Sequence, residues 1–232
     1  MMLEILYQDE YLVAINKPHG LLVHQSPIAR DASEFAIQLL RNQLQKKVYP
    51  VHRLDRKTSG VLLFAFDKEV NKLMTEIFTS KTIQKRYIAV VRGYAPDSLM
   101  IDYPLYTDDG RLQEAQTLIR TLCKAEIDLQ FGKHPTSRYS LIEAFPHTGR
   151  MHQIRKHLAH IFHPIIGDRP HGCNKQNKLW LETFHMNTML LHAESVQLTH
   201  PITNEKIKIK ANFHSEFVRV AQLLNLDLEN FV

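Results

Sequence analysis

Cysteine is scarce in this 232-residue chain, whose two cysteines, Cys123 and Cys173, stand far apart. This spacing excludes a zinc-finger pattern and a disulfide-stapled scaffold, and it is typical of a reducing compartment. Long apolar runs are also absent, because the longest, residues 61–66, falls well short of the roughly 18 residues that a membrane helix needs. The first ten residues carry three acids instead of a basic and apolar leader. We therefore expect a cytoplasmic protein with no membrane partner.

Glycine and proline are sparse as well, at 8 and 10 residues, and no repeat, low-complexity tract or linker divides the sequence. The content of 44% hydrophobic and 23% charged residues is that of an ordinary globular protein. We expect one domain spanning residues 1–232.

Acidic residues are missing from residues 77–96 and 145–164, and residues 46–60 hold one acid, Asp55, among five cations. The net charge of the whole chain is +5. Three acid-poor basic stretches favour one positive surface that binds a polyanion such as RNA. The alternative is a set of solvated basic faces with no partner.

Hydrophobic periodicity and turn residues predict a mixture of strands and helices. The expected strands are residues 11–15, 61–66, 87–91, 139–145, 196–199 and 206–210. The expected helices are residues 31–44, opened by a capping box of Asp31 and Glu34, residues 67 to about 77, residues 148–162, opened by Thr148, and residues 214–224. Because no βαβ rhythm repeats, the fold class is predicted to be α+β with a mixed, mostly antiparallel sheet flanked by helices.

The densest candidate for chemistry is residues 49–60, where Asp55 lies among three cations and His52, just before a Thr58-Ser59-Gly60 turn and a buried strand. Positive neighbours favour the charged carboxylate, which can act as a nucleophile or general base. The structural alternative is a turn in which Asp55 accepts backbone N–H bonds.

A second candidate is the predicted helix of residues 148–162. Helical geometry places Arg155 at the edge of an apolar stripe that includes Met151 and Phe162, so Arg155 should be half-buried and in need of a carboxylate or phosphate. A structural ion pair or a snorkelling stem is the alternative. Arg150 and the free N–H groups at the helix start could hold a phosphate.

A third candidate is the basic run before Tyr87. Lys85 and Arg86 beside an aromatic ring suit a nucleotide, with the ring holding a base and the cations its phosphates. Plain sheet packing of Tyr87 is the alternative.

Five histidines between residues 147 and 163 raise the question of a metal site. Their helical directions scatter and no acid lies nearby, so we expect no metal. A two-metal nuclease is also excluded, because its site needs several carboxylates and each basic stretch holds at most one.

Taken together, these motifs resemble the RluA-type pseudouridine synthases. The resemblance covers the chain to about residue 213. It rests on Asn16-Lys17-Pro18-His19-Gly20-Leu21, His52-Arg53-Leu54-Asp55 with Thr58-Ser59-Gly60, Lys85-Arg86-Tyr87, Gly149-Arg150-Met151-His152-Gln153-Ile154-Arg155, His163-Pro164-Ile165-Ile166-Gly167-Asp168 and Leu191-His192-Ala193. Residues 4–10 and 157–172 most resemble the tRNA-modifying branch of that family, and we expect no N-terminal S4 domain.

The resemblance implies the pseudouridine synthase fold and a role for each matched residue. Asp55 matches the catalytic aspartate, Tyr87 the tyrosine that stacks on the target base, and Arg155 the arginine that pairs with the aspartate. Substrate-binding positions are implied or expected at Arg53, Leu54, Arg86, Arg150 and Leu191, with Leu54, Tyr87 and Leu191 as pocket walls.

The family's reaction detaches uracil from C1′ of its ribose, rotates it and rejoins it through C5, without a cofactor. The branch implies uridine 65 in the T-stem of tRNA as the target, which must be flipped out of its stem. We expect a monomer with no obligate protein partner. Three alternatives stay open: the same reaction on ribosomal RNA, a non-catalytic RNA-binding or chaperone module, and a ribonuclease using His52 or His152.

Overall fold

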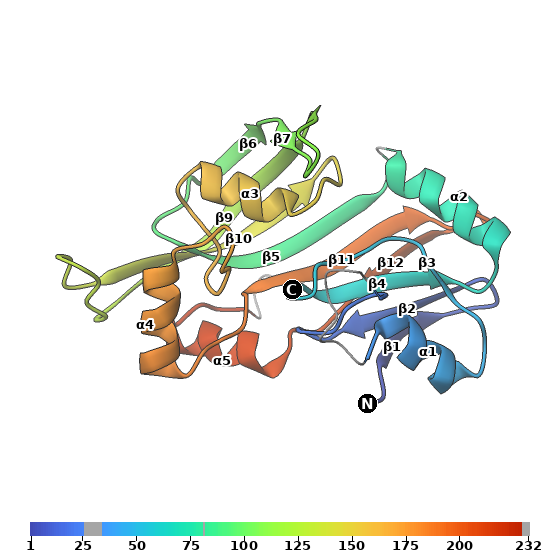
Figure 1. The fold of residues 1–232 in the computed structure, drawn as a ribbon, viewed down its shortest axis with the longest axis horizontal. Coiled ribbons are helices and arrows are strands. Elements are labelled where there is room, and N and C mark those ends of the chain that lie inside the picture. Colours follow the sequence, from blue (N-terminus) through green and yellow to red (C-terminus); the bar gives the residue numbers. More distant parts are fainter. Residues whose placement is uncertain (26–33, 81, 229–232) are drawn as a thin grey trace. The chain divides into compact units, whose positions relative to one another are not determined.

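The computed structural model describes residues 1–25, 34–80 and 82–228, and the chain forms two compact units. Unit 1 comprises Met1–Lys85 and Ala193–Asn212, and unit 2 comprises Arg86–His192 and Phe213–Val232. Neither unit is one continuous stretch of sequence, because the chain passes between them after Lys85, His192 and Asn212. The N-terminus belongs to unit 1 (Figure 1).

Unit 1 is built on an antiparallel sheet. Its elements are β1 (Glu4–Gln8), β2 (Leu12–Lys17), α1 (Ala36–Leu44), β3 (Tyr49–Pro50), β4 (Ser59–Ala65), α2 (Lys68–Thr79), most of β11 (Leu191–Thr199) and β12 (Lys206–Lys210). In the sheet, β2 pairs with β1 and β4, and β11 lies next to β4 and pairs with β12. Every residue of β4 is buried, which makes this strand the centre of the unit.

The helix α2 covers one face of this sheet, as its sequence predicts. Asp67 is the N-cap and its Oδ1 accepts a 2.8 Å hydrogen bond from the Val70 N–H. Val70 and Met74 are buried against Leu63 and other residues of the sheet, whereas Leu73 is 39% exposed. The predicted start and inner face of this helix are confirmed, with Leu73 at its margin.

The structure corrects one predicted boundary. The strand β4 begins at Ser59, so Ser59 and Gly60 belong to the strand and not to the predicted turn. Gly60 has a φ of +108°, and a Cβ there would come within 2.2 Å of the Ala193 carbonyl oxygen. Only glycine fits this close approach of two backbones.

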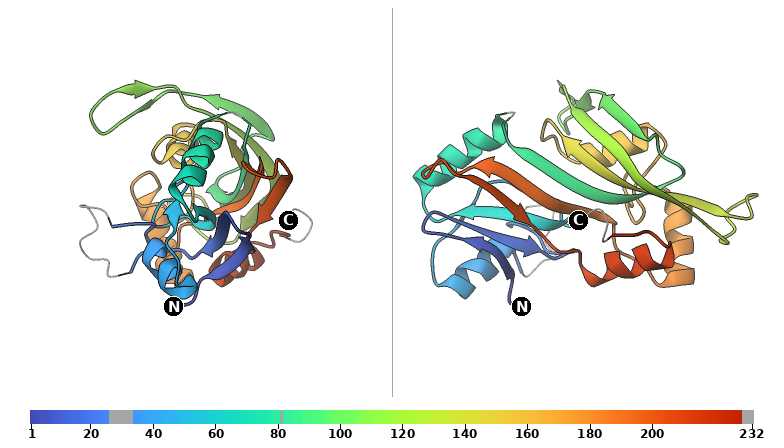
Figure 2. Two further views of the ribbon diagram at one scale, coloured as in Figure 1. Left: turned by 90° about the vertical axis from the view of Figure 1, so that its right-hand side faces the viewer. Right: turned by 180° about the vertical axis from the view of Figure 1, so that it is seen from behind.

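In unit 2, antiparallel strands of the sheet lie between two helical layers. Its elements are β5 (Gln84–Arg92), β6 (Ser98–Asp102), β7 (Leu105–Tyr106), β8 (Leu112–Gln113), β9 (Gln116–Ile127), β10 (Ser137–Pro146), α3 (Gln153–His160), α4 (Asn174–Phe184) and α5 (Ser215–Leu223). The sheet order is β5-β10-β9-β6, and β7 and β8 form a separate hairpin. The hairpin of β9 and β10 extends beyond the rest of unit 2 (Figure 2).

Side-chain alternation on β5 divides the core of unit 2 into two layers. Ile88 and Val90 pack with Trp180 of α4 and Phe217 of α5. The intervening Ala89 and Val91, with Ala144 of β10, pack instead with Ile154 and Leu158 of α3. The period of two along the strand therefore places α3 on one face and α4 and α5 on the other.

The helix α3 begins five residues later than predicted, at Gln153. Thr148 does not cap it, because the Thr148 hydroxyl donates to Gln153 Oε1 at 2.6 Å and accepts from the Gln116 N–H of β9. His152 precedes the helix in the left-handed conformation, with a φ of +56°. Met151 and Phe162 are 41% and 86% exposed, so neither belongs to the predicted apolar stripe.

Two further boundaries differ from expectation. The helix α1 begins at Ala36 after Phe35, which makes no side-chain cap bond, and the predicted capping residue Asp31 lies outside the described residues. The helix α4 was not predicted, although its inner residues Gln176 and Trp180 are one helical turn apart. The predicted α+β class with a mostly antiparallel sheet is confirmed. Among helices of the described residues, none is long and apolar enough to cross a bilayer.

Candidate active site

Asp55 lies in unit 1, in the loop between β3 and β4. Its carbonyl accepts a hydrogen bond from the Thr58 N–H at 3.1 Å, which closes a turn around the aspartate. Leu54 is buried at 6% exposure, Asp55 is half-buried and Arg53 is exposed. The loop thus keeps its apolar side chain inside while its carboxylate and the Arg53 guanidinium reach the surface.

A buried ammonium group fixes this loop. Lys17, at the end of β2, is completely buried, and its Nζ donates to the carbonyl oxygens of Pro18, Leu21 and Arg56 at 2.9, 2.8 and 3.2 Å. The Gly20 N–H also donates to the Arg56 carbonyl at 2.8 Å. Burial lowers the pKa of Lys17 to about 7, and the charge of Asp55 acts in the opposite direction.

The ammonium has three N–H donors and here meets three carbonyl acceptors, so it cross-links residues 17–21 to the loop that carries Asp55. The sequence analysis named Lys17 only within the motif of residues 16–21. The signal for its role was a lysine that directly follows Asn16 at the end of an apolar strand.

His52 supports the same loop as a neutral side chain. Its Nε2 accepts a 3.2 Å hydrogen bond from the Leu63 N–H of β4, and its ring stacks on Phe78 with the centroids 4.5 Å apart. Burial, together with the positive charge of Lys85, lowers the pKa of His52 to about 3. His52 is therefore a neutral imidazole and not an imidazolium at neutral pH, which weighs against its use as the general acid of a ribonuclease.

The depressed pKa of His52 predicts a loss of stability in acid. Between pH 6.5 and pH 3 the unfolded chain binds a proton at this residue and the folded chain does not, so the free energy of unfolding falls as the pH falls through this window. Between pH 7 and pH 5 the His52 contribution should fall by about 2 kcal/mol. Urea unfolding at both pH values should show a smaller acid loss for His52→Gln than for the wild type.

The exposed His24 offers the matched control. His24→Gln should keep the acid loss of the wild type. Equal pH dependence for His52→Gln and the wild type would contradict a neutral His52.

Tyr87 and Leu191 lie in unit 2, against one hydrophobic cluster. Leu191 is a buried member of this cluster at 3% exposure, and the half-buried Tyr87 packs against it. Ile154 and Leu158 of α3, the helix that carries Arg155, belong to the same cluster. The structure thus brings two predicted pocket-wall residues and the Arg155 helix together.

Arg155 is bound to a carboxylate that sequence reasoning did not assign to it. Its Nε and Nη2 donate to Asp168 Oδ2 and Oδ1 at 2.7 and 2.8 Å, and the two residues are only 5% and 1% exposed. The prediction of half burial was therefore wrong, because the guanidinium is fully enclosed. The expected need for an anionic partner holds, and two parallel bonds fix the plane of the guanidinium.

The loop after α3 holds Asp168 rigidly. The Asp168 carbonyl accepts from Asn177 Nδ2 at 2.7 Å, and Asn177 Oδ1 in turn accepts from the Gly167 N–H at 2.9 Å. Asp168 Oδ1 also accepts from the His171 N–H, whose ring nitrogen Nε2 lies 2.9 Å from His152 Nδ1. Asp168 is thus a fixed anchor for Arg155.

The two remaining predicted cations already have protein partners. Arg86 Nε donates to Glu143 Oε2 at 2.7 Å, across the pair of strands β5 and β10. Arg150 is exposed, and its Nε donates to the Glu114 carbonyl at 3.0 Å. The Arg150 N–H donates to Gln153 Oε1, so it is not one of the free N–H groups expected for phosphate at a helix start.

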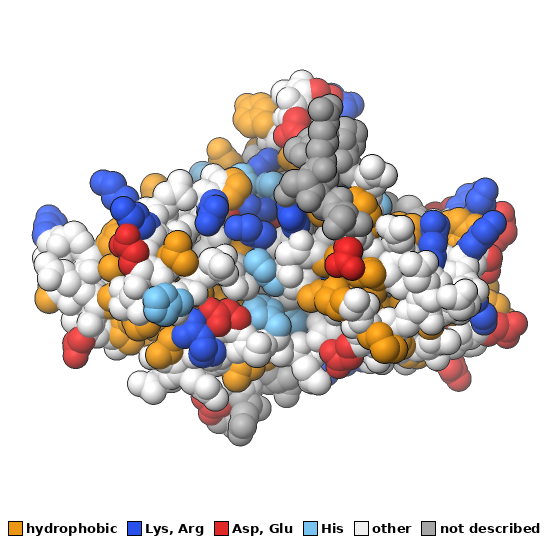
Figure 3. Space-filling view, turned by 60° about the horizontal axis from the view of Figure 1, so that its bottom comes forward, with side chains coloured by type: hydrophobic (Ala, Val, Ile, Leu, Met, Phe, Trp, Pro, Cys, Tyr) orange, Lys and Arg blue, Asp and Glu red, His pale blue; other side chains and the backbone are white. Residues whose placement is uncertain are grey.

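On the face shown in Figure 3, Lys and Arg side chains lie at several places, with Asp and Glu side chains among them. No group of three His, Cys, Asp or Glu side chains that could hold a metal ion occurs within the described part of the chain.

Comparison with known proteins agrees with these features. Residues 11–160 match the family described as RNA pseudouridylate synthase. The chain is 45% identical to tRNA pseudouridine synthase C of Pasteurella multocida, over 99% of both chains, and 44% identical to the protein of that name from Haemophilus influenzae, over 97% of both. The solved structure of human RNA Pseudouridylate Synthase Domain Containing 4 is 25% identical, with a TM-score of 0.73 over 97% of this chain and 94% of that one.

The structural likeness confirms the predicted pseudouridine synthase fold. The family match also confirms the reaction expected from the sequence motifs, the isomerisation of uridine to pseudouridine in RNA. The chain belongs to the RluA-type RNA pseudouridine synthases.

Proposed function

We propose that this enzyme converts uridine 65 in the T-stem of tRNA to pseudouridine and that Asp55 is its catalytic residue. The choice of tRNA is supported by the names of relatives that are about 45% identical over nearly the full chain. The structural observation that carries the role of Asp55 is its loop, which is clamped through Arg56 by the buried Lys17 ammonium and closed by Thr58. A carboxylate on so fixed a loop can meet a reacting sugar carbon without reorganisation.

The reaction exchanges one glycosidic bond for another. The bond between N1 and C1′ breaks, the uracil rotates, a bond between C5 and C1′ forms, the hydrogen on C5 leaves as a proton, and N1 takes up a proton. Asp55 acts either by attacking C1′ or as the base that leads to a glycal-like intermediate, and both routes need the ionised carboxylate. No step needs a redox partner or a cofactor.

The other predicted residues are proposed to handle the base and its backbone. Tyr87 stacks on the uracil, with Leu54 and Leu191 as further apolar walls that keep water from the detached base. Arg155, oriented by Asp168, is proposed to pair with Asp55. Arg53 is proposed to reach into the RNA where the base has left, and Arg86 and Arg150 are proposed to contact phosphates.

We also propose that residues 1–232 form a single catalytic domain and that the enzyme works in the cytoplasm as a monomer. Both cysteines are free thiols, which agrees with a reducing compartment.

Tritium release from RNA labelled at C5 of uridine tests the proposed substrate. Each turnover frees one C5 hydrogen, so the wild type should release tritium from bulk tRNA and leave ribosomal RNA unchanged. Replacing uridine 65 in a tRNA transcript by cytidine should remove the release. Release from ribosomal RNA alone would overturn the tRNA proposal, and shortened RNA with cyclic phosphate ends would indicate a ribonuclease.

A further inference from the structure

A cavity of about 550 Å³ lies in unit 2, at the loop end of the hairpin of β9 and β10. Its walls include Arg92, Phe131, Arg138 and Gln176, none of which belongs to the residues assigned to the reaction. The volume lies within the range of sites that bind small molecules. We call it the hairpin cavity.

The first feature that points to a ligand is a buried amide with one unpaired end. Gln176 of α4 is 2% exposed, and its Nε2 donates to the Tyr139 hydroxyl at 3.1 Å. Among the described residues, its Oε1 has no hydrogen-bond partner. Buried polar atoms without a partner are rare because they are unfavourable, so a bound molecule with a suitably placed N–H or O–H donor would satisfy this oxygen.

The second feature is an arginine that no carboxylate neutralises. The Arg92 guanidinium lies over the Phe131 ring, 5.1 Å from its centroid, and has no ion-pair or hydrogen-bond partner in the parts of the chain that the structure describes. The nearby Glu126 is already committed, because it accepts from Tyr94, Thr136 and Arg138. The Arg92 N–H donors therefore remain available to an anion.

These groups match the parts of a nucleotide. A base offers N–H donors for Gln176 Oε1 and a flat face for the arginine and aromatic planes, and its phosphate offers an anion for Arg92. A paired base could not enter, because its edge and both faces are occupied inside a duplex. Since the substrate of this enzyme is RNA, we propose that the hairpin cavity binds one unpaired nucleotide of that RNA, apart from the uridine that reacts.

Trp180 provides a direct probe of this cavity. It is the single tryptophan of the chain, and its Nε1 donates to the Tyr139 hydroxyl at 3.0 Å, the same hydroxyl that binds Gln176. Binding at Gln176 Oε1 should therefore change the tryptophan emission without any need for turnover. A tRNA transcript and a short single-stranded ribonucleotide oligomer should each produce a saturable change, and a fully paired RNA duplex should produce none.

Arg92→Gln should weaken the binding of the oligomer and raise the KM for tritium release about tenfold, with kcat unchanged. Gln176→Met, which removes the amide at similar volume, should do the same. The matched control is Lys133→Gln, which removes one positive charge from the same hairpin outside the cavity wall and should have an effect of less than twofold. Circular dichroism and melting temperature check that each variant is folded.

Three results would overturn the proposal: an emission unchanged at saturating oligomer, Arg92→Gln indistinguishable from Lys133→Gln, or kcat lowered with KM unchanged. Failure of the proposed function looks different, because the wild type would then release no tritium from tRNA. The two failures are therefore read from separate measurements.

Discussion

Replacing Asp55 by Asn should lower tritium release from tRNA by a factor on the order of 10⁴, because the amide is neither a nucleophile nor a base. RNA affinity should stay within about tenfold, since phosphate contacts by Lys and Arg supply most of it. Single-turnover assays at saturating enzyme separate the lost chemistry from any change in binding. The fold should tolerate the change, because the amide keeps the shape of the carboxylate and Asp55 is only half-buried.

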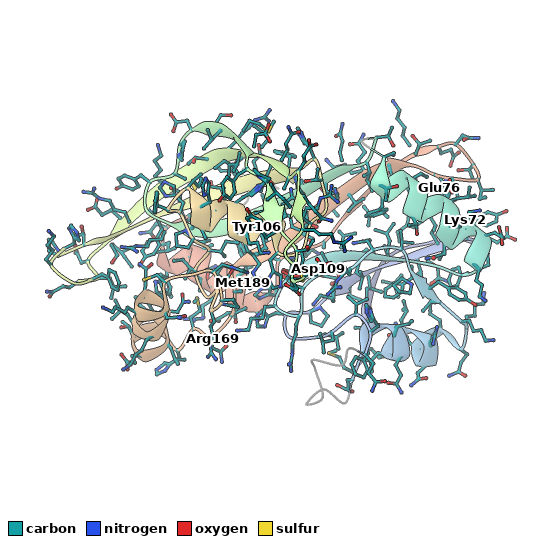
Figure 4. The ribbon with its side chains drawn as sticks, turned by 45° about the horizontal axis from the view of Figure 1, so that its top comes forward. Lys72, Glu76, Tyr106, Asp109, Arg169 and Met189 are labelled. Atoms are coloured by element: carbon teal, nitrogen blue, oxygen red, sulfur yellow. The ribbon has the colours of Figure 1, made fainter. Side chains whose placement is uncertain are left out.

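Glu76→Gln is the matched control for this variant. Glu76 is an exposed carboxylate on α2 in the same unit, where Lys72 lies one helical turn away (Figure 4). Its loss should leave release within twofold of the wild type. Undiminished turnover by Asp55→Asn would rule out Asp55 as the catalytic carboxylate.

The same variant separates an enzyme from an RNA-binding or chaperone module in the cell. If a strain that lacks the protein is rescued by Asp55→Asn as well as by the wild type, the essential role is binding. If only the wild type rescues, the isomerisation itself is the biological function.

Removing Asp168 should destabilise the fold strongly. Asp168→Ala leaves the Arg155 guanidinium at 5% exposure without its carboxylate, and stranding a buried charge costs about 3–5 kcal/mol. In a chain of this size the melting temperature should fall by about 10 °C. Activity should fall further than the folded fraction does, because the released guanidinium loses its fixed orientation.

A double variant separates stability from positioning. Replacing the pair by Asp168→Leu with Arg155→Met removes both charges together and should recover most of the stability, since apolar residues of similar volume often substitute well for a buried ion pair. Tritium release should stay lost. If release returns with stability, Arg155 and Asp168 have a structural role only. A melting temperature unchanged in Asp168→Ala would show that the pair contributes little.

The sequence predicted elements well where local signals were strong. The strand β12 matches residues 206–210 as predicted, and α2 and α5 each begin one residue after their predicted first residues, Asp67 and His214. The predicted start of α3 was wrong because the Thr148 hydroxyl hydrogen-bonds to Gln153 and to the Gln116 N–H of β9. These tertiary contacts replace the helix-capping bond that a threonine often makes. The helix α4 was overlooked because its inner face is polar at Gln176.

For the site, sequence motifs named Asp55, Tyr87 and Arg155, and their roles in the reaction are predictions. What the sequence could not show was contact between residues distant along the chain. The partnership of Arg155 with Asp168 and that of Arg86 with Glu143 arise only after the chain folds. The role of Lys17 depends on three carbonyl groups, which any residue type could supply.

The discontinuous sequence of unit 1 has a consequence for its synthesis on the ribosome. Met1–Lys85 contain the fully buried β4, but β11 and β12, which complete the sheet beside it, lie in Ala193–Asn212. One edge of the apolar strand β4 therefore has no partner strand until more than a hundred further residues are translated. Contacts of such long sequence separation form slowly. The nascent N-terminal segment thus needs protection from aggregation, whereas Arg86–His192 can begin to fold as they emerge.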